Sequence, residues 1–297
     1  MKTIALLFAL GISTFAAAGE LVNGQGLTAS QIVEKNVAAR GGLDAWRKIQ
    51  SMVWVGHIEN NSAPGPSLPF DLDMKRPNKT RFLIKAQSQT SVRIFDGIHG
   101  WTLRPSIRGE PEAQPYTPQE LNFAREGQGF DGPLIDYQAK GISIALEGVD
   151  EIEGRQAYRL SVKLPSGDSH HVWVDAKTFL DIKYDRTSRD AYGRSNMVSV
   201  FYRDYETVDG LQIPLRIETS TNTAKAKEEL VIDRVLVNPP LEDRIFVKPY
   251  ISGWRSASTI DIGSTRTARP PMRPRTAMSS GYPGMGTTSV PGPGVTQ

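Results

Sequence analysis

Residues 68–75 read LPFDLDMK, and apolar side chains recur at every second position of this stretch. Successive side chains of an extended chain point to opposite sides, so Asp71 and Asp73 share one side and the alternate apolar residues share the other. This alternation is typical of a β-strand that has one apolar and one hydrated face, as strands of antiparallel sheets have. The stretch therefore predicts a strand of an antiparallel sheet.

The same alternation continues on both sides of this stretch. It is present at residues 52–58 and 81–87, and a second series of strands follows residue 141. That second series covers residues 142–149, 157–164, 170–175, 179–186, 197–207, 211–220 and 228–237. Glu153-Gly154 and Asp209-Gly210 are typical hairpin turns between such strands. Together these segments predict roughly a dozen strands.

Helix signals occur before the first strand and between the two strand series. Thr28 and Gln31 are spaced as a capping box, and residues 43–49 suggest a short second helix. A further helical segment is predicted over residues 117–138, with an interruption near 127–133 where Gly and Pro are frequent. The helices are therefore placed to cover a sheet.

These elements predict an α+β fold. A long succession of antiparallel strands with one apolar face forms either a closed barrel filled by side chains or an open half-barrel that helices close. We expect the second arrangement, a curved antiparallel sheet forming an incomplete β-barrel of about 11–12 strands, covered by helices. Such a sheet can enclose an apolar cavity large enough for a ligand.

The two ends of the chain differ from this middle part. Residues 1–18 combine Lys2, a short apolar run and an Ala-x-Ala sequence, which predicts a secretory signal peptide cleaved near Ala18. No later segment has the roughly 20 apolar residues of a membrane-spanning helix, so we do not expect an integral membrane protein. Residues 255–297 contain six Gly and six Pro, which predicts a disordered tail. A single domain is expected at residues 19–254.

Charge is distributed unevenly along the chain. The formal net charge is +3, whereas the tail alone has five arginines against one acidic residue, Asp261. The rest of the chain is therefore slightly acidic, which does not suit a groove that follows phosphates, and nucleic acid is not an expected partner. The basic tail fits either a solvated extension or a weak tether to anionic lipid or another polyanion.

Residues that carry enzyme chemistry are few. The chain has no cysteine, which excludes disulfides, thiolate metal sites and a cysteine nucleophile. Its four histidines are His57, His99, His170 and His171. The adjacent pair would point to opposite faces of a strand, so no metal site is predicted. The sequence contains no G-x-S-x-G and no G-x-x-x-x-G-K-[ST] phosphate-binding loop. We therefore expect neither an enzyme nor a bound cofactor.

Several motifs together resemble those of a known family. They are Ile32-Val33-Glu34-Lys35 with Gly41-Gly42-Leu43-Asp44-Ala45-Trp46, Phe95-Asp96-Gly97 with Gly100-Trp101, Phe130-Asp131-Gly132-Pro133-Leu134-Ile135-Asp136-Tyr137 with Lys140-Gly141, Val174-Asp175-Ala176-Lys177-Thr178-Phe179-Leu180, and Asn238-Pro239-Pro240-Leu241 with Ile245-Phe246. In the order of these motifs the chain resembles the LolA/LolB-like superfamily, periplasmic lipoprotein-sorting carriers of Gram-negative bacteria. The resemblance spans residues 28–249.

The resemblance implies a periplasmic, non-enzymatic carrier that binds the acyl chains of a lipoprotein or lipid in an apolar cavity and takes part in outer-membrane lipoprotein sorting. Donor or acceptor proteins of the inner or outer membrane would be further partners. Burial of an acyl chain is worth about 0.8 kcal/mol per CH₂, so a chain of about 16 carbons costs on the order of 12 kcal/mol in water. That cost explains the need for a carrier.

Apolar residues of the alternating strands are the candidates for lining the cavity, and packing in a filled core is the alternative reading of each. The candidates are Trp54, Phe70, Phe82, Ile84, Trp101, Tyr158, Leu160, Trp173 and Phe201. Two other functions stay open at this point: an extracytoplasmic binding or scaffold protein of the cell envelope, and a hydrolase that uses the same cavity. The cargo, the direction of transfer and the oligomeric state are not specified by the sequence.

Overall fold

The computed structural model describes residues 26–249 except 61–64, 87–88, 105–111, 128, 190–194 and 223–226. The signal peptide predicted at residues 1–18 and the tail predicted at residues 255–297 lie outside the described residues.

Four helices are present in the described ranges. They are α1 (Ala29–Ala39), α2 (Leu43–Arg47), α3 (Pro118–Glu126) and the 3₁₀ helix η1 (Asp243–Phe246). The capping box predicted at Thr28 and Gln31 is confirmed, and Thr117 and Glu120 form a second one at the start of α3. In each box the threonine hydroxyl accepts a hydrogen bond from a backbone N–H of the first turn, which satisfies a donor that has no partner inside the helix.

The strands form one antiparallel sheet. They are β1 (Ser51–Asn60), β2 (Leu68–Lys75), β3 (Lys79–Ala86), β4 (Gln89–Phe95), β5 (Gly100–Leu103), β6 (Ala113–Pro115), β7 (Ser143–Ile152), β8 (Arg155–Lys163), β9 (Ser169–Asp175), β10 (Asp181–Arg189), β11 (Ser195–Val208), β12 (Leu211–Thr221) and β13 (Lys227–Val237). Their order in the sheet is β6-β5-β4-β3-β2-β1-β13-β12-β11-β10-β9-β8-β7.

The sheet consists of two strand series joined at one long-range pair. Consecutive strands are neighbours within β1–β6 and within β7–β13, and β1 pairs with β13 to connect the two series. In the described part of the chain β6 and β7 are edge strands, so the sheet stays open. It has 13 strands instead of the predicted 11–12. The segments found by alternation do not include β4, β5 and β6, and β5 and β6 have only four and three residues, too few for alternation to reveal them.

The helical segment predicted over residues 117–138 is also shorter in the structure. Helix α3 ends at Glu126, and residues 130–141 form a succession of turns. Gly129 and Gly132 have φ angles of 64° and 70°, a left-handed conformation that no helix interior contains. The glycines therefore end the helical path where the sequence suggested only an interruption.

One edge strand contains a bulge. The register between β7 and β8 shifts between Leu146 and Gly148, so Glu147 is an extra residue on β7. Its carboxylate lies 3.2 Å from both Arg159 Nε of β8 and His171 Nε2 of β9. The extra residue is thus turned toward basic side chains of the neighbouring strands.

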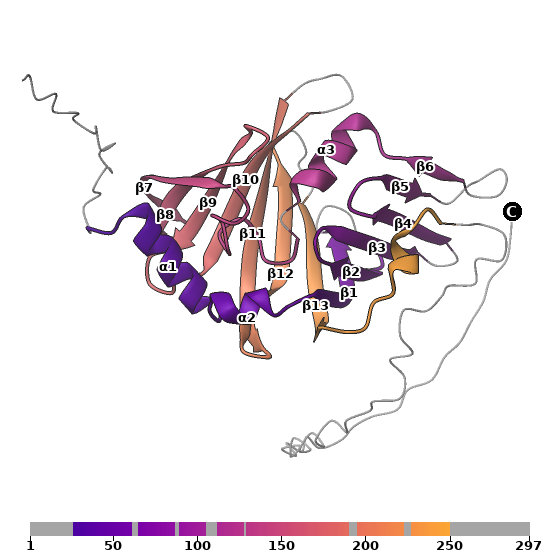
Figure 1. The fold of residues 1–297 in the computed structure, drawn as a ribbon, viewed down its shortest axis with the longest axis horizontal. Helices are drawn as coiled ribbons and strands as arrows, with labels where there is room; N and C mark the ends of the chain where they lie inside the picture. The colour runs from indigo at the N-terminus through magenta and orange to yellow at the C-terminus, as the bar shows by residue number, and fades with distance from the viewer. Residues whose placement is uncertain are drawn as a thin grey trace, which may run out of the picture. The chain divides into compact units, whose positions relative to one another are not determined.

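Two faces of the sheet are covered differently. Ile32 and Val33 of α1 and Trp46 of α2 pack on one face, which we call the helix-covered face (Figure 1). Helix α3 reaches the same face through an ion pair of 3.0 Å between its Glu120 and Arg93 of β4. The opposite face contacts η1, whose Asp243 lies 2.7 Å from Lys75 Nζ and 2.9 Å from Lys79 Nζ.

Candidate functional site

Strand register shows which side chains share the helix-covered face. Directly opposed residues of an antiparallel pair point to the same side of a sheet. Trp54 of β1 is opposite Leu72 of β2, which is opposite Phe82 of β3. In the other direction the same side leads from Ile58 through β13, β12, β11, β10 and β9 to Leu160 of β8. The helix-covered face is therefore one surface that runs across both strand series.

Beneath α1 this surface is a filled core. We call its buried residues the α1 cluster: Ile32, Val33, Leu134, Ile142, Leu146, Tyr158, Leu160, Val162, Leu164, Val172 and Val174. The exposed fractions of Leu160, Val162 and Val174 are all 0%, and so is that of Ile32 on the helix. Eight apolar residues that pack against this cluster are partly buried, but only two of them, Ile144 and Tyr184, are on strands, so the sheet is almost completely covered here.

The other half of the helix-covered face is less completely covered. We call its buried residues the β1 cluster: Trp46, Ile49, Met52, Trp54, Ile58, Phe70, Met74, Phe130, Ile135, Leu211, Ile213 and Ile232. Ten apolar strand residues pack against this cluster and are only partly buried: Leu68, Leu72, Phe82, Ile84, Val208, Leu215, Ile217, Leu230, Val235 and Val237. The partly exposed apolar strand residues of the helix-covered face therefore lie mainly around β1.

The nine residues predicted to line a cavity fall on both faces. Six of them are on the helix-covered face: Trp54, Phe70, Phe82 and Ile84 belong to or pack against the β1 cluster, and Tyr158 and Leu160 belong to the α1 cluster. Three are on the opposite face: Trp101 of β5, Trp173 of β9 and Phe201 of β11. One cavity on one face therefore cannot be lined by all nine residues.

Two of the three residues on the opposite face, Trp173 and Phe201, have polar surroundings. Lys183 of β10 is opposite both Trp173 and Phe201, and its Nζ lies 4.3 Å and 5.7 Å from the centres of their rings. The Trp173 indole donates a hydrogen bond of 2.8 Å to Asp150. Ring contacts with a lysine and a hydrogen bond to a carboxylate suit a hydrated face better than an acyl chain. Binding of acyl chains by the other six stays a prediction.

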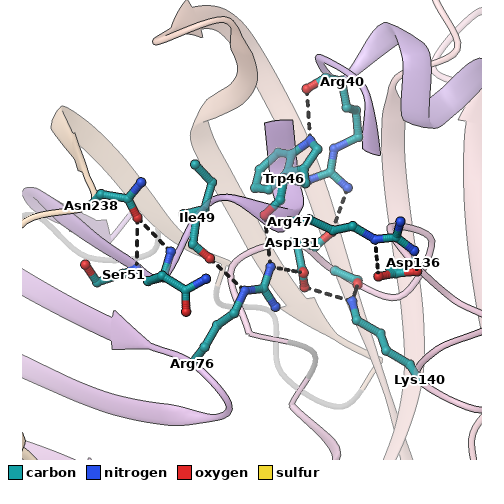
Figure 2. A network of polar contacts seen from close by, with 12 residues as sticks. Arg40, Trp46, Arg47, Ile49, Ser51, Arg76, Asp131, Asp136, Lys140 and Asn238 are labelled. Carbon is teal, nitrogen blue, oxygen red and sulfur yellow. Dashed lines mark hydrogen bonds and ion pairs between the residues drawn. The ribbon is translucent and has the colours of Figure 1, made fainter. Parts of the chain in front are cut away.

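A buried carboxylate organises the turns that lie between the two clusters (Figure 2). Asp131 accepts a hydrogen bond of 2.7 Å from Arg76 Nη2 and one of 2.8 Å from Lys140 Nζ, one on each oxygen. Arg40 Nη1 donates to the Asp131 backbone carbonyl at 2.9 Å. Three basic residues from α1, the β2–β3 turn and the 130–141 segment thus converge on one aspartate.

Backbone carbonyls and a second carboxylate, that of Asp181, also bind the same basic residues. Arg76 Nε donates to the Ile49 carbonyl at 2.7 Å, and Lys140 Nζ donates to the Gly132 carbonyl at 2.6 Å. Arg40 also forms a buried ion pair of 3.2 Å with Asp181. Because these partners are fixed by the backbone, the positions of the basic groups are fixed too.

Arg47 and Asp136 form an exposed pair beside this network. The Arg47 guanidinium donates two hydrogen bonds, of 2.9 Å and 2.8 Å, to the two oxygens of Asp136 (Figure 2). These bonds lower the pKa of the Asp136 carboxyl below its ordinary value. Burial acts on Lys140 and lowers the pKa of its ammonium group, although Asp131 opposes that shift. The network therefore has a hydrated and a buried side.

Two adjoining pockets open onto these residues. The first has a volume of about 270 Å³ and is lined by Arg47, Arg76, Asp131, Ile135, Asp136, Ala139 and Lys140. The second has a volume of about 400 Å³ and is lined by Arg76, Pro77, Asn78, Arg125, Glu126, Gly127, Lys140, Leu164, Pro165 and Ser166. Arg76 and Lys140 line both, so the two pockets form one polar depression, which we call the cationic pocket.

The described residues show no cluster of three or more His, Asp or Glu side chains placed to hold a metal ion. The same residues include no helix that is long and apolar enough to cross a membrane.

Solved structures similar to this chain include members of the superfamily that the sequence motifs resemble. A LolA superfamily protein from Nitrosomonas europaea is 17% identical, with a TM-score of 0.47 over 75% of this chain and 98% of its own. A DUF1329 family protein from Desulfovibrio piger is 13% identical, with a TM-score of 0.49 over 74% of this chain and 97% of its own. A domain described as an outer membrane lipoprotein-sorting protein from Vibrio parahaemolyticus is 13% identical, with a TM-score of 0.47 over 72% and 94%.

The likeness to these structures concerns the fold alone. No protein-family model matches the chain, and no curated protein matches it either.

Sequence reasoning missed the polar network. The segment that contains Asp131 and Lys140 contributed to the family resemblance, and Arg76 was read only as part of a turn. The one available signal was local: several charged residues stand beside Gly and Pro in segments predicted to be turns. Nothing in the spacing showed that residues 40, 76, 131 and 140 meet, because they come from three separate segments.

Proposed function

We propose that the protein is a periplasmic carrier that binds acyl chains of a lipid or lipoprotein on the helix-covered face, at the β1 cluster. The observation that supports it is the set of ten partly buried apolar strand residues packed against that cluster. The sequence resemblance to lipoprotein-sorting carriers points to the same class of ligand. The proposal needs no covalent chemistry, because release of bound chains requires only displacement from an apolar surface.

The energetics favour this half of the face over the other. When an acyl chain covers apolar protein surface, both are removed from water, and each Å² of buried apolar surface contributes roughly 25 cal/mol of favourable free energy. Only two strand residues that pack against the α1 cluster, Ile144 and Tyr184, are partly buried, and Tyr158 and Leu160 within it are 2% and 0% exposed. At the β1 cluster Phe82 and Ile84 are partly exposed, whereas Phe70 and Trp54 are only 1% and 9% exposed. We therefore assign the binding surface to the strands around β1 and keep Phe82 and Ile84 as the candidates among the predicted residues.

The first test is extraction of the purified full chain with organic solvent, followed by lipid analysis by mass spectrometry. The proposal expects co-purified lipid or acylated peptide in stoichiometric amount. Protein that is free of lipid and does not bind a fluorescent fatty acid would contradict the proposal and favour the scaffold alternative. Hydrolysis of an ester substrate would favour the hydrolase alternative; we expect none.

A matched pair of variants on β3 locates the surface. Ile84 packs against the β1 cluster, whereas the next residue, Lys85, is exposed and pairs with Asp71 on the opposite face at 2.8 Å. Ile84→Gln is expected to weaken binding of a fluorescent fatty acid about tenfold, because it removes apolar contact and adds a polar group. Lys85→Gln is expected to leave binding unchanged. Equal effects of the two variants would contradict the assignment to this face.

A further inference from the structure

The cationic pocket has more basic than acidic groups. Four basic side chains line it, Arg47, Arg76, Arg125 and Lys140, together with the acidic residues Asp131, Asp136 and Glu126. This excess stands out because the chain outside the basic tail is slightly acidic. A concave site with a local positive charge attracts anions.

Asp131 is the most deeply buried acidic residue of the pocket, and both of its carboxylate oxygens have hydrogen-bond partners within the protein. The side chain of Asp131 is 2% exposed, and both of its oxygens already accept hydrogen bonds from Lys140 and Arg76. It holds the two basic groups in place from the inner side and leaves their other donors to the pocket. This arrangement fixes the donors before a ligand arrives, which lowers the entropic cost of binding.

Several of those donors have no partner in the described part of the chain. Arg76 makes its hydrogen bonds through Nε and Nη2, so Nη1 stays free for a ligand. Lys140 Nζ makes two hydrogen bonds, and an ammonium group has three donors. Arg125 makes one hydrogen bond, a long one of 3.4 Å to the Ile98 carbonyl. A forked guanidinium beside an ammonium group suits the oxygens of a phosphate.

The pocket also adjoins the β1 cluster. Ile135 lines the first pocket and belongs to the β1 cluster. The Arg76 guanidinium carbon lies 4.9 Å from the centre of the Phe130 ring, another member of that cluster. Its volumes of about 270 and 400 Å³ lie near the lower end of small-molecule sites, roughly 300–1,000 Å³, which suits a headgroup better than a whole lipid.

We propose that the cationic pocket binds the phosphate of an amphiphile whose acyl chain lies on the β1 cluster. This inference rests on the proposed function and narrows its ligand to a phosphate-bearing lipid in preference to an acylated peptide without phosphate. Arg76, Lys140 and Arg125 donate to the phosphate oxygens. Arg47, held by Asp136, adds positive charge at the rim.

Binding of three soluble probes to the full chain, measured by isothermal titration calorimetry, tests the inference. Palmitoyl lysophosphatidylglycerol carries both an acyl chain and a phosphate, monopalmitoylglycerol carries the same chain without phosphate, and glycerol 3-phosphate carries the phosphate alone. Arg125→Gln removes an exposed donor of the pocket. Lys140→Gln removes a buried one, and its thermal unfolding is recorded as a check of folding. Arg244→Gln is the matched control, because Arg244 is 79% exposed and does not line the pocket.

We expect the lysophospholipid to bind at least about tenfold more tightly than monopalmitoylglycerol, since hydrogen bonds to a charged group have this strength. We expect Arg125→Gln to reduce that advantage severalfold, Lys140→Gln to reduce it further, and Arg244→Gln to leave it unchanged. A different result would support a phosphate site whose ligand is a free phosphate compound. In that case glycerol 3-phosphate binds saturably, Arg125→Gln and Lys140→Gln weaken its binding, and the lysophospholipid binds no more tightly than monopalmitoylglycerol.

Other outcomes separate this inference from the proposed function. Equal affinities for the two lipids and no binding of glycerol 3-phosphate would overturn the phosphate site and leave the carrier intact. Binding of neither lipid would overturn the carrier, and the glycerol 3-phosphate titration would then decide the pocket alone. A lysophospholipid advantage that Arg125→Gln and Arg244→Gln both leave unchanged, with Lys140→Gln unable to fold, would overturn the assignment to this pocket.

Discussion

The α1 cluster and the β1 cluster are built from the same kinds of residue on the same face of one sheet, yet they differ in coverage. At the α1 cluster, beneath a helix of 11 residues, only two neighbouring strand residues, Ile144 and Tyr184, are partly exposed. At the β1 cluster the covering helix α2 has five residues, and ten neighbouring strand residues are partly exposed. The comparison teaches that the length of the covering helix, and not the apolar content of the strands, separates a structural core from a surface available to a ligand.

The largest expected effect comes from the segment that connects the two clusters. Leu134 belongs to the α1 cluster and its neighbour Ile135 to the β1 cluster, and both follow Asp131. Asp131→Asn would leave Arg76 and Lys140 without their buried counter-charge, so we expect the free energy of unfolding to fall by about 3–5 kcal/mol. Urea denaturation followed by circular dichroism measures this change.

A matched control keeps that prediction specific. Asp243 also has two lysine partners, but its side chain is 64% exposed. Asp243→Asn is expected to change stability little, because exposed ion pairs contribute little. Equal losses in the two variants would show that Asp131 does not organise the junction.

The next effect concerns the α1 cluster itself. Leu160→Ala removes a completely buried side chain, and we expect the free energy of unfolding to fall by about 2–5 kcal/mol. Affinity for a fluorescent fatty acid, measured under conditions where the variant is folded, is expected to stay the same. A tenfold loss of affinity for the fatty acid in Leu160→Ala would indicate that the ligand binds beneath α1. It would contradict the assignment of binding to the β1 cluster alone.

The same truncation in the β1 cluster is expected to give the reverse pattern. Ile217 is partly buried on the same face, so Ile217→Ala is expected to cost only about 1 kcal/mol of stability. Affinity for the fatty acid is expected to fall about fivefold, because contact with the ligand is lost. Stability loss as large as that of Leu160→Ala, without an affinity change, would mean that this half is an ordinary core.

The smallest effect is a pH dependence at the junction. The hydrogen bonds from Arg47 lower the pKa of Asp136, so the folded chain binds that proton at lower pH than the unfolded chain does. The stabilisation by the Arg47–Asp136 pair is therefore present above the pKa of Asp136 in the unfolded chain, about 4. It is lost as the pH falls through the lower pKa of Asp136 in the folded chain. We expect the difference in Tm between the unchanged chain and Arg47→Gln to shrink as the pH falls below about 5. A constant difference would contradict this role.

The sequence predicts the strands well because alternation is a property of each strand alone. Residues 68–75 show it clearly, and β2 has those bounds in the structure. Alternation within one strand does not reveal which of its sides faces the helices, since that depends on register with its neighbours. Trp173 was therefore grouped with Tyr158 and Leu160, although it is opposite Arg159 and lies on the other side.

The cationic pocket could not be predicted for a different reason. Its basic residues come from α2, the β2–β3 turn, α3 and the 130–141 segment, and only the folded topology brings them together. Charged residues in turns are ordinary in any chain, so Arg76 and Lys140 carry no local signal of their own. What distinguishes them is the burial of Asp131 between them, a property of packing that no short motif contains.

The bulge on β7 has a consequence for the solubility of the protein. In the described part of the chain β7 has no strand on its outer side, so its backbone offers unpaired donors and acceptors to other molecules. Flat, apolar edges of this kind lead to aggregation. Here the extra residue Glu147 disturbs the hydrogen-bond spacing, and exposed Glu151 adds a second negative charge along the same edge. A strand of a neighbouring copy therefore finds neither the regular ladder nor the neutral surface that amyloid-like growth requires.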